Sequence, residues 1–178
     1  MPLPPALRHV SQGEVFIASS PDACCGTILG SCVATLIWDS EAGVGGLNHL
    51  LLPTSKAADP TAEGHEVNLM ELLINGVLRA GASRQRLEAK VFGGARMIDR
   101  LGTTGPANAA FVERFLEAEA IPCTARSVGG RYARRLRVWP ARGRVQQLRL
   151  QRFDDVSDAL DSTTLRARTL KLSGVELL

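Results

Sequence analysis

The chain has 178 residues, of which 45% are hydrophobic and 22% charged, and a formal net charge of +3. This composition excludes a disordered or collagen-like protein and fits a single globular domain over residues 1–178. No apolar run is long enough to cross a bilayer, and residues 1–10 lack the apolar segment of a signal peptide. We therefore expect a cytoplasmic protein whose four cysteines are thiols rather than disulfides.

The order of β-rich and helical segments predicts an α+β protein. In chain order, strands are expected over residues 14–18, 32–38, 44–52, 87–92, 121–128, 134–139 and 145–150. Residues 66–80 carry apolar side chains at helical spacing, and a second helix is expected to begin at Pro106. Residues 54–64 are expected to form an exposed loop, and His9 and His65 to be solvated. The fold class is therefore stacked antiparallel or mixed β-sheets flanked by helices.

Cys32 and His49 are the candidate nucleophile and base. Suppose that Asp39 pairs with Val44 across a four-residue connection. His49 then lies opposite Ala34, and Cys32 is its diagonal neighbour on the same face of the hairpin. We expect the sulfur and a ring nitrogen to lie roughly within hydrogen-bonding reach. A three- or five-residue connection would place the two side chains on opposite faces.

A zinc site is an alternative use of the same region. Cys24, Cys25, Cys32 and His49 could supply four ligands, but no CxxC pair is present and adjacent cysteines rarely bind one tetrahedral ion together. We therefore expect no metal and no cofactor. Cys24, Cys25 and Cys123 are interpreted as small buried or partly buried thiols.

The stretch over residues 120–153 is one-sided in charge, with nine arginines and no acidic residue. Such a stretch permits a nucleic-acid-binding module held by phosphate contacts. However, Arg135 and Arg137 alternate with apolar residues, and Tyr132 and Trp139 offer little surface for base stacking. The pattern favours a strand with one solvated face, and no nucleic-acid partner is expected.

Several segments together resemble the CheD family of chemoreceptor glutamine deamidases. The segments that carry the resemblance are residues 27–34 (TILGSCVA), 45–53 (GGLNHLLLP), 87–95 (LEAKVFGGA) and 128–131 (VGGR). The likeness covers about residues 10–150, so that the tail over residues 154–178 has no assigned role. Residues 101–108 resemble a family loop but depart from its usual sequence.

The resemblance implies a protein-glutamine glutaminase that converts selected receptor glutamines to glutamate through a Cys32 thioester. It implies Cys32 as the nucleophile, His49 as the acid/base and Thr27 as the residue that orients the imidazole. It also implies a fold like the catalytic domain of the cytotoxic necrotizing factor toxins. The expected partners are chemoreceptors, the resemblance also allows a CheC-type phosphatase, and no membrane insertion is expected. A non-catalytic adaptor for either partner is the alternative, and Thr27 could instead be an ordinary strand residue.

Overall fold

The computed structural model describes residues 7–52, 60–97, 103–150 and 175–178. Its strands are β1 (Arg8–His9), β2 (Val15–Ala18), β3 (Cys25–Leu29), β4 (Val33–Asp39), β5 (Val44–Leu50), β6 (Glu88–Gly93), β7 (Cys123–Val128), β8 (Ala133–Trp139), β9 (Arg144–Leu150) and β10 (Val175–Leu177). Its helical elements are α1 (Pro60–Arg79), α2 (Thr104–Ala118) and two short 3₁₀ turns, η1 (Arg84–Arg86) and η3 (Pro140–Arg142).

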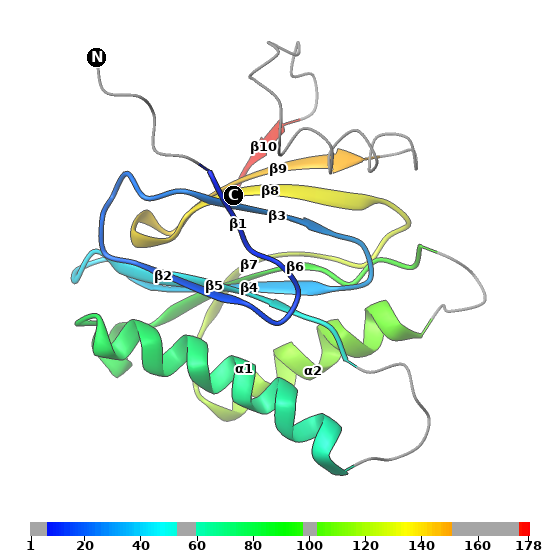
Figure 1. Cartoon of the computed structure of the whole chain (residues 1–178), viewed down its shortest axis with the longest axis horizontal. Helices are drawn as coiled ribbons and strands as arrows, with labels where there is room; N and C mark the ends of the chain where they lie inside the picture. The colour runs from blue at the N-terminus through cyan, green and yellow to red at the C-terminus, as the bar shows by residue number, and fades with distance from the viewer. Residues whose placement is uncertain (1–6, 53–59, 98–102, 151–174) are drawn as a thin grey trace.

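These elements form three layers, with two stacked β-sheets and a layer that holds α1 and α2 (Figure 1). One sheet has the strand order β1-β3-β8-β9-β10, and the other has the order β2-β5-β4-β6-β7. Both sheets are mixed, because β1 pairs with β3 and β6 pairs with β7 in parallel while the remaining pairs are antiparallel. The expected α+β class with stacked sheets and flanking helices is confirmed. None of the helices in the described part of the chain is long and apolar enough to span a membrane.

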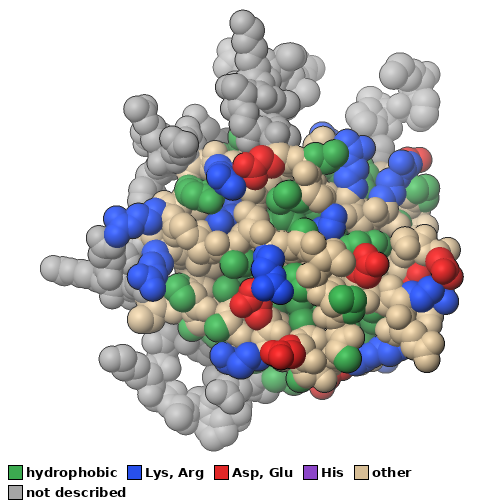
Figure 2. All heavy atoms as spheres, turned by 180° about the vertical axis from the view of Figure 1, so that it is seen from behind, with side chains coloured by type: hydrophobic (Ala, Val, Ile, Leu, Met, Phe, Trp, Pro, Cys, Tyr) green, Lys and Arg blue, Asp and Glu red, His purple; other side chains and the backbone are tan. Residues whose placement is uncertain are grey.

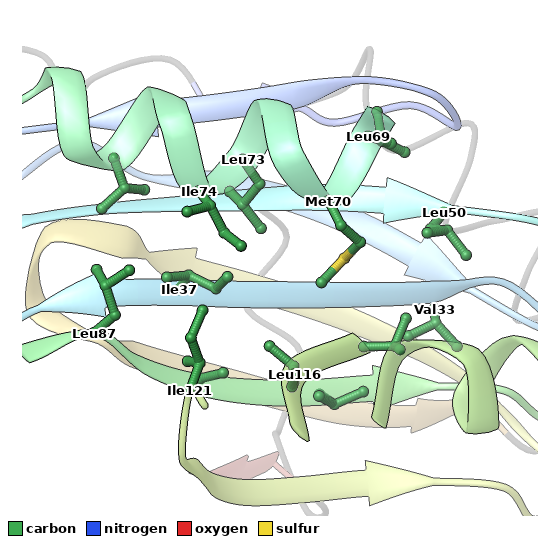
Figure 3. Packing of buried hydrophobic residues seen from close by; sticks show 14 of the residues in the cluster. Val33, Ile37, Leu50, Leu69, Met70, Leu73, Ile74, Leu87, Leu116 and Ile121 are labelled. Carbon is green, nitrogen blue, oxygen red and sulfur yellow. The ribbon is translucent and has the colours of Figure 1, made fainter. Parts of the chain in front are cut away.

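The hairpin β4–β5 lies in the middle layer and is buried on both faces. On one face, its side chains pack against α1 and α2, and Figure 3 shows Val33, Ile37 and Leu50 meeting Leu73 and Leu116 there. Each fully buried Leu or Ile of this kind contributes roughly 1.5–3 kcal/mol of hydrophobic stabilisation. This burial on two sides explains why β4 is mostly apolar, whereas β5 also carries the buried polar residues Asn48 and His49.

The other face of the hairpin packs against the second sheet. Apart from Val10, which follows β1, the buried residues between the two sheets come from β3, β8 and β9 on one side and from β4, β5 and β6 on the other. They are Cys25, Leu29, Leu136, Val138 and Val145, facing Ala34, Leu36, Trp38, Leu47 and Phe92. A side chain that points from β5 into this layer therefore meets side chains from β3.

The register of the hairpin is the predicted one. Asp39 pairs with Val44 and Ala34 pairs with His49, across the four-residue connection. The Asp39 carboxylate fixes this turn, because it accepts hydrogen bonds from the backbone N–H of Ala42 and from the Arg86 guanidinium. Burial alone would raise the pKa of Asp39, but these hydrogen bonds hold it well below its usual range.

Three expectations about local structure need correction. Helix α1 begins at Pro60, so the loop predicted over residues 54–64 is wrong from residue 60 onward, and residues 53–59 lie outside the described residues. Proline is favoured in the first turn of a helix, where its missing N–H needs no partner. His65 consequently lies in α1, and His9 is half-buried in β1 rather than solvated. Helix α2 begins at Thr104, two residues before the predicted start.

Candidate functional site

The imidazole of His49 is held at its Nδ1 atom by Thr27 of strand β3 and by Val10, which follows β1. Nδ1 lies 2.9 Å from the Thr27 hydroxyl oxygen and 3.1 Å from the Val10 carbonyl oxygen. The Thr27 hydroxyl itself donates to the Val10 carbonyl over 2.8 Å, so its oxygen is left to accept a hydrogen bond. Both neighbours of Nδ1 are thus acceptors, and this network assigns the proton of the neutral ring to Nδ1.

The second ring nitrogen, Nε2, therefore carries a free lone pair. It is buried and has no hydrogen-bond partner among the described residues. Burial lowers the pKa of His49, and the hydrogen bond to the Val10 carbonyl opposes this shift only in part. The ring is therefore neutral around pH 7 and can accept a proton at Nε2.

The Cys32 side chain lies on the same side of the hairpin as His49. Ala34 pairs directly with His49, and Cys32, two residues before Ala34, packs against the cluster between the sheets. Burial raises the pKa of Cys32, and its own backbone N–H opposes this shift. Cys32 is thus a neutral, half-buried thiol. The predicted shared face is found, whereas a direct hydrogen bond from Cys32 to His49 is not formed within the described residues.

The backbone around Cys32 is fixed by hydrogen bonds from outside its own strand. Three consecutive carbonyl oxygens each accept one hydrogen bond, from α2 or from the segment that follows β6. The pairs are Gly30 O with Ala95 N (2.9 Å), Ser31 O with Asn108 Nδ2 (2.7 Å) and Cys32 O with Gly94 N (2.8 Å). Sequence reasoning did not single out Asn108, although it lies at the end of the segment that departs from the family loop.

The close approach of β6 to Cys32 requires glycine at position 93. Gly93 has a φ of +110°, which L side chains rarely adopt. A Cβ atom there would lie 2.1 Å from the Cys32 carbonyl oxygen. The Gly-Gly pair of the sequence therefore lets a neighbouring strand contact the backbone of the candidate nucleophile.

The other three cysteines are free thiols in less suitable places. Cys25 points between the sheets, where burial and the neighbouring Cys24 raise its pKa to about 12. Cys123 lies at the start of β7 and contacts the carbonyl of Ala125. In the described parts of the chain, no three His, Cys, Asp or Glu side chains converge where they could hold a metal ion.

Several arginines of the stretch over residues 120–153 form contacts with other residues of the protein. Arg134 is buried, and its guanidinium donates to the Gly129 carbonyl. Arg142 and Arg149 form ion pairs with acidic residues, and Arg137 stacks over the Trp139 ring. Figure 2 shows basic and acidic side chains interspersed on one face of the molecule. These arginines therefore have contacts within the protein itself.

The sequence model described as "CheD chemotactic sensory transduction" matches residues 51–149, more than half of the chain. The chain belongs to the CheD family. A relative from Cereibacter sphaeroides is 52% identical over 151 residues, which cover 85% of this chain and 76% of the relative. Relatives from Rhizobium etli (51% identity) and Caulobacter vibrioides (50%) match over 143 residues, which cover 78% of this chain and 77% and 75% of theirs.

Each of these three CheD relatives is named a probable chemoreceptor glutamine deamidase. Among solved structures, the Bacillus licheniformis hypothetical protein YfiH is 12% identical with a TM-score of 0.40. That match covers 64% of this chain and 49% of YfiH, and a likeness of this size does not bear on function.

Proposed function

We propose that this CheD protein hydrolyses selected glutamine side chains of chemoreceptors to glutamate and ammonia. Its relatives with this name are 52% and 51% identical to it. The observation that carries the proposed chemistry is the buried His49 Nε2, which has a free lone pair and lies on the same side of the hairpin as the Cys32 thiol. In this proposal Cys32 is the nucleophile, His49 the acid/base and Thr27 the residue that orients the imidazole.

In the first half of the reaction, His49 Nε2 takes the thiol proton as Cys32 Sγ attacks the carboxamide carbon. The C–S bond forms, and the carbonyl π electrons move to oxygen to give a tetrahedral oxyanion. In this proposal the backbone N–H of Cys32, which lies against the sulfur, donates a hydrogen bond to that oxygen. When the intermediate collapses, the imidazolium returns its proton to nitrogen, so ammonia leaves and a thioester remains.

In the second half, His49 Nε2 removes a proton from water, which attacks the thioester carbon. The C–S bond breaks, the sulfur recovers its proton from the imidazolium, and glutamate is released. Both halves use Nε2 alone, while Nδ1 keeps its proton and its hydrogen bonds to Thr27 and Val10. A ring fixed in this way need not rotate between accepting and donating the proton.

The test is incubation of the protein with cytoplasmic fragments of chemoreceptors from the same cell, followed by peptide mass spectrometry. Specific glutamines should gain the mass difference between an amide and an acid. Binding without conversion would support the adaptor alternative instead. A cytoplasmic location and a CheC-type phosphatase partner remain parts of the proposal, and pull-down from the native cell would test that partner.

Thr27→Val should lower the turnover number about 10-fold. A carboxylate that orients a catalytic histidine is worth about 10⁴ in turnover, and a neutral hydroxyl stabilises the imidazolium less. The free energy of unfolding should change by less than about 1 kcal/mol, because valine keeps the branched shape.

Thr35→Val is the matched control for Thr27→Val. Thr35 is also a buried strand threonine, but its hydroxyl has no hydrogen-bond partner among the described residues. Its turnover should equal that of the wild type. If Thr27→Val behaved like this control, Thr27 would be a structural residue and the site a Cys–His dyad.

The acid limb of kcat/KM should lie below pH 6.5, because burial lowers the pKa of His49 from that ordinary value. His9 adds to this shift, and the Val10 carbonyl and Glu14 oppose it. The neutral ring accepts the proton, so activity should persist above the folded-state pKa and fall as the pH drops through it. The raised pKa of Cys32 predicts no alkaline loss from the thiol, because the thiolate attacks. The measurement is kcat/KM from about pH 5 to about pH 9. A midpoint of the acid limb above pH 6.5 would contradict this prediction.

A further inference from the structure

Asn108 connects the two chain segments that flank the candidate site. It lies near the start of α2 and is completely buried. Its Oδ1 atom accepts a hydrogen bond from the Leu52 N–H over 2.8 Å, and its Nδ2 atom donates to the Ser31 carbonyl over 2.7 Å. One side-chain amide thus contacts the residue before Cys32 and the residue two positions after the end of β5.

The position of this amide follows from the hairpin register. The last pair of the β4–β5 ladder is Val33 with Leu50, and the same register would bring Ser31 opposite Leu52. The Asn108 side chain supplies an acceptor to one strand and a donor to the other, as a peptide group would. The Asn108 side chain therefore replaces direct backbone hydrogen bonds between the segments at Ser31 and Leu52, and it separates these two segments beside Cys32.

Holding the Ser31 carbonyl also fixes the N–H of the next residue. The peptide bond between Ser31 and Cys32 is trans, so its C=O and N–H point in opposite directions. Because the carbonyl points to Asn108, the Cys32 N–H points away from it, and it lies against the Cys32 sulfur. No other residue in the described segments accepts a hydrogen bond from this N–H. Within the described part of the chain, the Cys32 sulfur is thus the only hydrogen-bond partner of this donor.

We propose that Asn108 is a positioning residue of the deamidase, which aims the Cys32 N–H at the oxyanion of the tetrahedral intermediate. The inference rests on the proposed function and adds to it the residue that prepares the oxyanion site. A preorganised donor of this kind acts on charge that develops only during the reaction. Its loss should therefore lower kcat and leave KM nearly unchanged.

The first test compares Asn108→Asp with Asn48→Asp. Asn108→Asp keeps the acceptor for the Leu52 N–H and removes the donor to Ser31. Asn48 is equally buried, accepts from the Thr35 N–H over 2.9 Å and donates to the Met70 sulfur over 3.2 Å on the helix side of the hairpin. The kcat of Asn108→Asp should fall about 100-fold, the effect of losing one oxyanion donor, whereas Asn48→Asp should stay within about threefold of the wild type.

The second measurement is alkylation of Cys32 by iodoacetamide at alkaline pH, where the thiol is ionised. This displacement forms no oxyanion, so its rate in Asn108→Asp should stay within about threefold of the wild type. Asn108→Ala removes the same donor, together with the acceptor for the Leu52 N–H, without adding a charge, and it should show the same split between kcat and alkylation. It also replaces the aspartate variant if that variant does not fold.

Two results would overturn the inference. One is an equal fall of kcat and of the alkylation rate, which would mean that Asn108 only supports the local fold. The other is a kcat in both Asn108 variants equal to that of the Asn48 control. If the wild-type protein itself converts no receptor glutamine, the proposed function is wrong, and the role of Asn108, which depends on it, is wrong too. This outcome differs from the two above, in which the wild type is active.

Discussion

Cys32→Ala should abolish glutamine deamidation. Removal of the nucleophile of a hydrolase of this type costs about 10⁶ in turnover, which leaves no measurable conversion in the mass-spectrometric assay. The free energy of unfolding should stay within about 1 kcal/mol of the wild type, because Cys32 is half-buried at the edge of the cluster between the sheets. Receptor binding should persist, since the rest of the surface is unchanged.

Cys123→Ala is the matched control, because Cys123 is also a free, half-buried thiol but lies at the start of β7. It should retain wild-type turnover. Loss of activity in both variants, with circular dichroism showing both folded, would mean that the wrong thiol had been assigned.

Gly93→Ala should lower both activity and stability severely. A left-handed backbone angle costs a non-glycine residue about 1–3 kcal/mol. In addition, the new Cβ would lie 2.1 Å from the Cys32 carbonyl oxygen, so the backbone of the proposed nucleophile must shift. Because a displacement of about 1 Å can cost 100-fold in rate, we expect the residual kcat to be at most about 1% of the wild type.

Gly129→Ala is the control for Gly93→Ala, because it introduces the same kind of backbone strain without a steric clash. Gly129 has a φ of +76°, but a Cβ there would meet no atom within 4 Å. Thermal unfolding should show a smaller loss of stability than in Gly93→Ala, and kcat should stay near the wild-type value. Equal effects in the two variants would show that contact with Cys32 is not what makes glycine necessary at position 93.

The part of the site that depends on local sequence could be predicted. A four-residue connection fixes the hairpin register, and that register alone places Cys32 and His49 on one face. Strands β4 and β5 could be predicted because each is a short, mostly apolar segment bounded by turn residues or proline. The resemblance added Thr27 as the partner of the imidazole, and Thr27 does contact His49.

The parts that depend on distant contacts could not be predicted in this way. Strand β3 has five residues and contains a glycine, so its sequence lacks a clear period. Strands β1 and β10 have two and three residues, and each exists because a longer strand lies beside it. Asn108 forms hydrogen bonds with Leu52 and Ser31, which lie 56 and 77 positions earlier in the chain. No local sequence pattern predicts hydrogen bonds between residues so far apart.

The hydrogen bond between Thr27 and His49 joins two different sheets, because Thr27 belongs to β3 and His49 to β5. The distance between the two sheets therefore determines the orientation of the imidazole. That distance is determined by the apolar side chains packed between the two sheets. Substitutions among those side chains are tolerated for folding as long as total volume is kept. For turnover the tolerance is narrower, since a slip of one sheet over the other would turn Nε2 away from the thiol. For the proposed Cys–His chemistry, we therefore expect substitutions in this core to lower turnover before they lower stability.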